Sequence, residues 1–309
     1  MSYHIVTIDA PECSLTCRDG QLTCSTPGES KPKTIPLEDV ASIVITSFSA
    51  SLHSHLLVEA AKHGVALVFC ESFKPVSLLL PANRATDTLL TRAQIEIAKR
   101  ERATLWRRTV DAKCGNQLSL ARHLAPDHPG LREIESSALG KHEHKEAITA
   151  RRFWSLYGAV LGKPDFQRDR ASKGLNSLLN YGYAVLLSSV LQKLFGLGLD
   201  PTFGIAHVVR ERSTPLAYDL MEPWRPCVDW RVAQWVRSHP DPADHAVTPA
   251  FRKWVTGFPL VEVDYLGLTL DIIGCIEGVI RSFRKAVTSN RPGLYQPWTP
   301  KNSKWAGSW

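Results

Sequence analysis

The sequence predicts an α+β protein in which a small β-rich N-terminal domain, residues 1–85, precedes a larger and mostly α-helical domain, residues 91–309. Short runs rich in Val, Ile, Leu and Thr fill the first 85 residues, and such runs are typical of strands. From residue 91 onward the apolar residues recur at helical spacing, and loops rich in Gly and Pro separate the segments. A chain of 309 residues is long enough for two domains with substantial cores.

The expected strands of the N-terminal domain are HIVTI, CSLTC, QLTCST, DVASIVITS, VALVFC and VSLLL. Arg-Asp-Gly at residues 18–20 predicts a turn that joins the second and third strands into a hairpin. One helix is expected among the strands, over residues 54–63, and it ends at Gly64 because glycine is favoured just beyond a helix C-terminus.

The cysteines do not indicate a disulfide framework, because there are seven of them, scattered from Cys13 to Cys275. Cys13, Cys17 and Cys24 are close in sequence, but no CxxC pair occurs and the hairpin pattern places them on a buried face, so a core role is favoured over zinc. A reducing compartment is therefore expected. No signal-peptide pattern or uninterrupted apolar span is present, so a cytoplasmic location without membrane contact is predicted.

Positive charge is placed unevenly along the chain, which carries 37 Lys and Arg against 30 Asp and Glu, a net charge of +7. Residues 91–113 contain no Gly or Pro and are expected to form one long amphipathic helix. Its basic face includes Arg107 and Arg108 and is predicted to contact phosphates.

The C-terminal stretch after Glu277 has no acidic residue. Its basic residues are Arg281, Arg284, Lys285, Arg291, Lys301 and Lys304. Its aromatic residues are Phe283, Tyr295, Trp298, Trp305 and Trp309. Basic groups between aromatic rings suit a polyanion with stackable bases, although a solvated basic tail explains this stretch equally well.

Glu146 is a candidate metal ligand because of its place on an expected helix. It shares one helical stripe with the apolar residues Ala150, Phe153, Trp154 and Tyr157, at i+4, i+7, i+8 and i+11. A carboxylate on a buried stripe is costly unless it is paired with a cation or bound to one. The sequence therefore favours a cation beside Glu146.

His207 ends an apolar run, and Asp219 and Glu222 follow it, three residues apart. Each has a simple structural explanation, since a lone histidine in apolar surroundings is usually a core residue and Asp-x-x-Glu before Pro223 has the spacing of a helix capping box. Together with Glu146, however, they form a set of carboxylates and one imidazole without a thiolate. That set suits Mg²⁺ or Mn²⁺, which act as Lewis acids on phosphoryl oxygens.

Four motifs in order make the sequence similar to a known family. They are Glu146 followed by RRFW at 151–154, NSLLNYGY at 176–183, GIAH at 204–207 and YDLMEPWRP at 218–226. In this order they resemble the CRISPR-associated endonuclease and integrase that inserts new spacers. The strand-rich start also looks like that family's N-terminal domain, and the forms LNYGY and DLMEP look most like the branch found in type II systems.

The resemblance implies that Glu146, His207 and Glu222 are catalytic and hold a divalent metal, Mg²⁺ or Mn²⁺. Many family members have Asp in place of Glu222. The supporting residues implied are Asp219, Tyr181 and Asn180. Asp219 is either a further ligand or a support for the others, and Tyr181 and Asn180 are expected to line the site.

The resemblance also implies partners. The β-rich domain is expected to build a homodimer, and a small partner protein of the adaptation machinery is expected to bridge two dimers. The DNA is double-stranded and comprises the incoming fragment and the repeat array. The basic residues assigned to DNA contact are Arg107, Arg108, Arg151, Arg281, Arg284 and Lys285.

The implied function is a metal-dependent DNA endonuclease and integrase of prokaryotic antiviral defence. The 3′-hydroxyl of a short incoming duplex attacks a phosphodiester at a repeat boundary, whereas water as the nucleophile makes the same site an endonuclease. The main alternative is a non-catalytic DNA-binding scaffold, in which His207 is a core residue and Asp219 and Glu222 cap a helix. A phosphoesterase for small nucleotides is a second alternative, and the basic segments argue against it.

Overall fold

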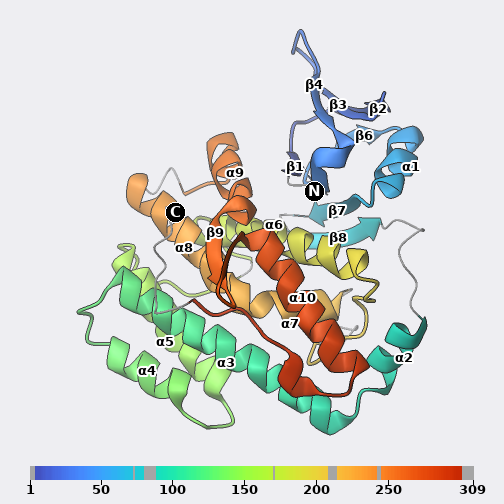
Figure 1. Cartoon of the computed structure of the whole chain (residues 1–309). Coiled ribbons are helices and arrows are strands. Elements are labelled where there is room, and N and C mark those ends of the chain that lie inside the picture. The colour runs from blue at the N-terminus through green and yellow to red at the C-terminus, as the bar shows by residue number, and fades with distance from the viewer. Residues whose placement is uncertain are drawn as a thin grey trace.

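The computed structural model describes residues 4–71, 74–79, 88–169, 171–207, 214–241 and 245–300. Strands dominate the N-terminal part, at one end of the molecule, and helices form most of the rest (Figure 1). The predicted α+β class is thus confirmed. The expected domain boundary near residue 85 and the predicted basic and aromatic residues Lys301, Lys304, Trp305 and Trp309 lie outside the described ranges.

Two four-stranded sheets make up the N-terminal part. The first contains, in spatial order, β1 (His4–Ile8), β5 (Val40–Ile45), β7 (Ala66–Glu71) and β8 (Lys74–Leu79). In this sheet β1, β5 and β7 are parallel and β8 is antiparallel to β7. The second contains β4 (Lys33–Pro36), β3 (Gln21–Ser25), β2 (Ser14–Arg18) and β6 (Ser51–Leu52). All six predicted strands are present, while the short β4 and β6 have too few residues to give a periodic signal.

The predicted local features of this part are confirmed. The β2–β3 hairpin turns through Asp19 and Gly20, whose φ angles of 50° and 71° lie in the left-handed region that such tight turns require. Helix α1 (Ser54–Lys62) is followed by Gly64 at φ 71°. Cys13 and Cys17 are buried in the apolar cluster of the second sheet and the half-buried Cys24 packs against that cluster, so all three contribute to the core.

Helices form most of the remaining chain. They are α2 (Thr88–Glu96), α3 (Lys99–Leu124), α4 (Leu131–Leu139), α5 (Lys145–Val160), α6 (Leu175–Gly196), α7 (Pro215–Met221), α8 (Arg225–Ser238), α9 (Pro249–Thr256) and α10 (Ile272–Thr288). A hairpin of β9 (Glu262–Tyr265) and β10 (Leu268–Asp271) precedes α10. The prediction of one helix over 91–113 is wrong, because Ala98 is extended, with ψ 151°, and separates α2 from α3. No helix in the described ranges is long and apolar enough to cross a membrane.

Helix α6 lies at the centre of the molecule and connects its two parts. Val44, Val68 and Cys70 of the first sheet belong to the same apolar cluster as α6, and α6 runs beside β7 and β8 in Figure 1. The buried hydroxyls of Ser42 and Ser188 are 2.5 Å apart across this contact. The sheet therefore shares its core with the helices.

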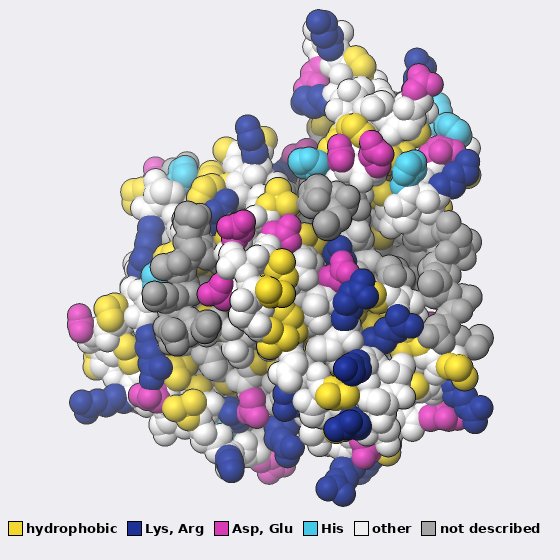
Figure 2. Space-filling view, viewed as in Figure 1, with side chains coloured by type: hydrophobic (Ala, Val, Ile, Leu, Met, Phe, Trp, Pro, Cys, Tyr) yellow, Lys and Arg dark blue, Asp and Glu magenta, His cyan; other side chains and the backbone are white. Residues whose placement is uncertain are grey.

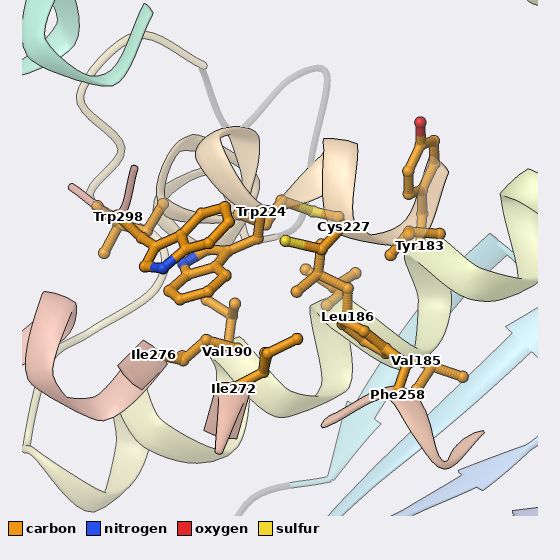
Figure 3. Close-up of a cluster of buried hydrophobic side chains, with 14 of the residues drawn as sticks. Tyr183, Val185, Leu186, Val190, Trp224, Cys227, Phe258, Ile272, Ile276 and Trp298 are labelled. Carbon is orange, nitrogen blue, oxygen red and sulfur yellow. The ribbon is translucent and has the colours of Figure 1, made fainter. Parts of the chain in front are cut away.

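A stacked tryptophan pair stabilises the packing around the short 3₁₀ turn η2 (Glu222–Trp224). Trp224 and Trp298 are buried, with ring centroids 4.9 Å apart and planes 15° from parallel (Figure 3). Between them and α3, the side-chain amide of Asn116 donates hydrogen bonds to the carbonyls of Pro223 (2.7 Å) and Trp298 (3.0 Å). These contacts fix the position of Glu222 relative to α3.

Candidate active site

Two predicted metal ligands, Glu146 and Glu222, contact the same side-chain cation, the ammonium of Lys113. Glu146 lies in the first turn of α5 and Glu222 begins η2, and both elements pack against α3. The Lys113 ammonium of α3 lies 2.6 Å from Glu146 Oε1 and 2.6 Å from Glu222 Oε2. The structure thus brings together two carboxylates that are 76 positions apart in the sequence, counted as 222 minus 146.

Lys113 is the residue of this cluster that the sequence interpretation misplaced. It is one of the basic residues of 91–113, whose basic face is predicted to contact phosphates, but only 8% of it is exposed. It lies on the buried stripe of α3 with Leu105, Thr109 and Asn116, at helical spacing from each. Burial pushes the pKa of Lys113 down, but the Glu222 and Glu146 carboxylates outweigh burial and raise that pKa above its usual value. Lys113 therefore remains a charged partner of both acids.

Glu222 has cations on both of its oxygens. Its Oε1 atom lies 3.0 Å from the Arg225 guanidinium, while its Oε2 atom contacts Lys113. Burial raises the pKa of Glu222, but the charges of Arg225 and Lys113 exceed that effect, and the net pKa is lowered. Glu222 is consequently an ionised, almost fully buried carboxylate.

Asp219 holds His207 in place. Its Oδ1 atom lies 2.7 Å from His207 Nδ1 and accepts the His207 backbone N–H at 3.2 Å. Its Oδ2 atom accepts the backbone N–H groups of Ile205 (2.5 Å) and Ala206 (3.1 Å). The capping-box interpretation is wrong, because Asp219 lies inside α7, completely buried, and its carboxylate holds the loop that carries His207.

This loop requires glycine at position 204. A Cβ atom on Gly204 would lie 2.5 Å from the His207 carbonyl oxygen and 2.7 Å from Pro215 Cβ. With Nδ1 facing Asp219, the Nε2 atom of His207 is the ring nitrogen that can bind a ligand. The hydrogen bond with Asp219 raises the pKa of His207 against the effect of burial, and Glu222 lies near enough to raise it further. His207 thus lies within electrostatic range of Glu222 and is not an isolated core histidine.

Among the described residues no group of three or more His, Cys, Asp and Glu side chains is arranged to hold a metal ion. The Lys113 ammonium lies between the Glu146 and Glu222 carboxylates, where a metal ion would otherwise lie. The Glu222 Oε2 atom faces the Lys113 ammonium at 2.6 Å. Glu146, Glu222 and the oriented imidazole of His207 supply carboxylate oxygens and one ring nitrogen, the donor types that Mg²⁺ or Mn²⁺ accepts.

Tyr181 and Asn180 occupy different surroundings. Tyr181 is buried between α6 and the N-terminal sheet, near Thr7, with its ring 6.2 Å from that of Phe251. It therefore packs between the two parts of the molecule instead of lining the carboxylate cluster. Asn180 accepts a hydrogen bond of 2.6 Å from Arg168, which places it in a neighbouring polar network.

That network leads back to Glu222. The guanidinium groups of Arg168 and Arg225 lie over the ring of Tyr183, at 5.3 and 5.0 Å from its centroid. The Tyr183 hydroxyl donates to Asp229 Oδ1 at 2.5 Å, and Arg225 contacts Glu222. Arg225 and Tyr183 belong to the sequence motifs quoted above, but nothing in the sequence pattern marks Arg168 or Asp229 as their partners.

Asp229→Asn is expected to change how stability depends on pH. Burial raises the pKa of Asp229 from 3.8 to about 7. The pKa of Asp229 is therefore higher in the folded state than in the unfolded state. The protonated carboxyl adds its full contribution to the unfolding free energy below about pH 4, and this contribution is lost as the pH rises through about 7. From pH 5 to pH 8 the wild type should therefore lose about 2–3 kcal/mol more unfolding free energy than the variant. Urea unfolding at both pH values measures this, and parallel pH profiles would contradict it.

The six residues assigned to DNA contact differ in their surroundings. Arg107, Arg151 and Lys285 are exposed, and Arg284 is half-buried. Arg281 is exposed but contacts Glu277 at 2.7 Å. The half-buried Arg108 donates from Nε to the Tyr295 carbonyl at 2.8 Å, so it helps to hold the C-terminal segment. Lys and Arg side chains gather over α10 on the face shown in Figure 2.

The described aromatic residues of the C-terminal stretch are buried and are not exposed for stacking on bases. Phe283, Tyr295 and Trp298 are all buried, and they pack against α3 and α10 and against Trp224. The prediction that they stack on bases is therefore wrong for these three. These three aromatic residues therefore belong to the core of a stretch that is otherwise rich in charge.

Comparison with known proteins identifies the family. A model of the family described as CRISPR associated protein Cas1 matches residues 6–248. The chain belongs to the Cas1 family. Among its curated relatives, the CRISPR-associated endonuclease Cas1 of Neisseria meningitidis is 28% identical over 282 residues, which cover 89% of each chain. The CRISPR-associated endonuclease Cas1 2 of Saccharolobus solfataricus is 30% identical over 217 residues, or 68% of each chain.

Solved structures share the Cas1 fold. A casposase bound to integration product has a TM-score of 0.80 and 19% identity, over 99% of this chain and 96% of the other. A Cas1 protein from Thermotoga maritima has a TM-score of 0.74 and 17% identity, over 91% of this chain and 96% of the other. The predicted family is confirmed, whereas its type II branch stays a prediction.

Proposed function

We propose that this Cas1 protein is a divalent-metal-dependent DNA endonuclease and integrase that inserts short fragments into a CRISPR array. The observation that carries the proposal is the convergence of Glu146 and Glu222 on one cation, at 2.6 Å each, beside a histidine that Asp219 orients. Its curated relatives carry the name endonuclease, and a casposase bound to integration product shares the fold.

Glu146, Glu222 and His207 Nε2 would hold Mg²⁺ or Mn²⁺. When bound, the ion supplies a Lewis acid for a phosphoryl oxygen of the attacked phosphodiester. Asp219 keeps the His207 ring in one orientation and fixes the tautomer, since it occupies Nδ1. Arg225 neutralises the second oxygen of Glu222 and limits its movement. No side chain is needed as a nucleophile, because a DNA 3′-hydroxyl or water attacks.

The proposed partners are double-stranded DNA, a second copy of the chain and a small protein of the adaptation machinery. A chain of a Cas6-RT-Cas1--Cas2 complex shares the fold with a TM-score of 0.77 and 14% identity, over 96% of this chain and 36% of the other, which supports the small partner. The exposed Arg107, Arg151 and Lys285 are available to pair with phosphates. The β-rich part is proposed to form the homodimer.

One observation favours the alternative of a non-catalytic DNA-binding scaffold. Lys113 and Arg225 already neutralise Glu146 and Glu222, so the cluster is stable as an ion-pair network without a metal. In a scaffold the only role of these four residues would be structural, as ion pairs that hold α3, α5, η2 and α8 together. The two functions predict different responses to metal.

A strand-transfer assay separates them. The purified protein, with and without its small partner, is mixed with a short duplex and a repeat-containing plasmid in Mn²⁺, Mg²⁺ or EDTA. The proposed function predicts a covalent duplex–plasmid product in either metal and none in EDTA. A scaffold predicts DNA binding in all three conditions, no joined product and no thermal stabilisation by Mn²⁺.

Arg107→Glu is expected to weaken duplex binding in a salt-dependent manner. Each lost phosphate contact lowers the slope of log affinity against log salt by about 1, and the reversed charge adds repulsion. Fluorescence anisotropy at several salt concentrations measures the slope. Arg107→Lys keeps the charge and serves as the control. An unchanged slope for Arg107→Glu would show that this part of α3 does not contact DNA.

A further inference from the structure

The charges of the two carboxylates at Lys113 are already balanced by their direct contacts. Glu146 and Glu222 carry two negative charges, and Lys113 and Arg225 carry two positive charges in direct contact with them. A divalent ion added to these four residues would leave two uncompensated positive charges beside the buried Glu222 and Lys113. Such an excess is unfavourable where little water can screen it.

Lys113 also occupies the position that an ion would take. Its Nζ atom is 2.6 Å from one oxygen of each carboxylate, and a bound Mg²⁺ lies at about 2.1 Å from its oxygen ligands. An ammonium and a metal ion cannot both lie between the same two oxygens. The Arg225 guanidinium contacts the other oxygen of Glu222 and does not compete for this position.

We propose that Lys113 is a built-in counter-ion that holds Glu146 and Glu222 together in the metal-free protein and that a divalent ion must displace. The inference rests on the proposed function of the same site. Lys113 is thus a positioning residue: it keeps the buried Glu222 carboxylate and the partly exposed Glu146 carboxylate from repelling each other until the ion arrives. The cost of displacing it lowers the affinity of the site for the ion.

Titration calorimetry of the full chain with Mn²⁺ tests this without an activity assay. Lys113→Met removes the competing charge and keeps the stem, so its Kd for Mn²⁺ is expected to fall about tenfold below the wild-type value. Lys113→Gln removes the charge but can still donate hydrogen bonds, and it should show the same change if the Met variant fails to fold. The metal-free variants should melt at lower temperature than the wild type, and Mn²⁺ should raise their Tm by more.

Lys193→Met is the matched control, because Lys193 is also partly buried and contacts Glu277 at 3.0 Å. Its Kd for Mn²⁺ should equal that of the wild type. If the wild type binds Mn²⁺ and both Lys113 variants bind it no more tightly, the counter-ion role is wrong while the metal site stands. If neither the wild type nor the Lys113 variants bind Mn²⁺, the metal-dependent function fails together with this inference.

Discussion

Glu146→Ala is expected to lower strand transfer about 1,000-fold or more, since a catalytic metal contributes several kcal/mol and each 1.36 kcal/mol changes a rate tenfold. Duplex binding should change by less than about 2-fold, because it rests on basic residues spread over the surface. The variant also leaves Lys113 with Glu222 as its only carboxylate partner among the described residues. A gel assay of joined product and an anisotropy titration measure the two quantities.

Glu143→Ala is the matched control for this prediction. Glu143 is an exposed acid that precedes Glu146 by three residues, just outside α5. Its removal should leave both strand transfer and duplex binding at wild-type levels. Full strand transfer by Glu146→Ala in Mn²⁺, or an equal loss in both variants, would refute the assignment of Glu146 to the site.

Trp224→Ala is expected to lower the free energy of unfolding by about 3–5 kcal/mol, as is usual for a buried tryptophan. The change removes the stack with Trp298 and leaves a cavity beside η2 (Figure 3). Because Glu222 begins the same turn, strand transfer should fall more than duplex binding does. Urea unfolding measures the stability and a strand-transfer time course measures the rate.

Two further variants make this result specific. Trp224→Phe keeps an aromatic ring and should cost less stability than Trp224→Ala. Trp254 is half-buried on α9, where Arg231 lies 3.3 Å from the centre of its ring. Trp254→Ala should therefore lower stability less and leave the ratio of strand transfer to binding unchanged. Equal loss of strand transfer in Trp254→Ala and Trp224→Ala would show that the effect is general destabilisation.

The strand-rich part of the fold could be predicted because local features determine it. Runs of β-branched residues mark the strands, and Asp19-Gly20 permits the left-handed turn between β2 and β3. The break between α2 and α3 was not visible, because Ile97 and Ala98 are ordinary helix residues. The two helices have different neighbours, since α2 packs against α10 whereas α3 packs against α4 and α5.

The site could be predicted only in part. Glu146, His207 and Glu222 stand out as polar residues in apolar surroundings, and the structure places Glu146 and Glu222 on one cation and His207 beside them. Lys113 was missed because it was counted among the basic residues of its segment, although its position on the buried stripe of α3 distinguishes it from Arg107.

Asp219 shows a second limit of sequence reasoning. The spacing of Asp219 and Glu222 matches a capping box, and a cap depends only on neighbours in sequence. The carboxylate instead accepts N–H groups from a loop 12 to 14 positions away. Such contacts depend on how α7 and that loop are packed together, which a local pattern does not contain.

The most direct test of the metal site is anomalous diffraction from crystals of the protein soaked in MnCl₂. We expect a single strong peak about 2.1 Å from carboxylate oxygens of Glu146 and Glu222 and from His207 Nε2, with the Lys113 ammonium moved away. The proposed metal site would be contradicted by crystals in which no Mn²⁺ lies at this place and Lys113 still joins the two carboxylates.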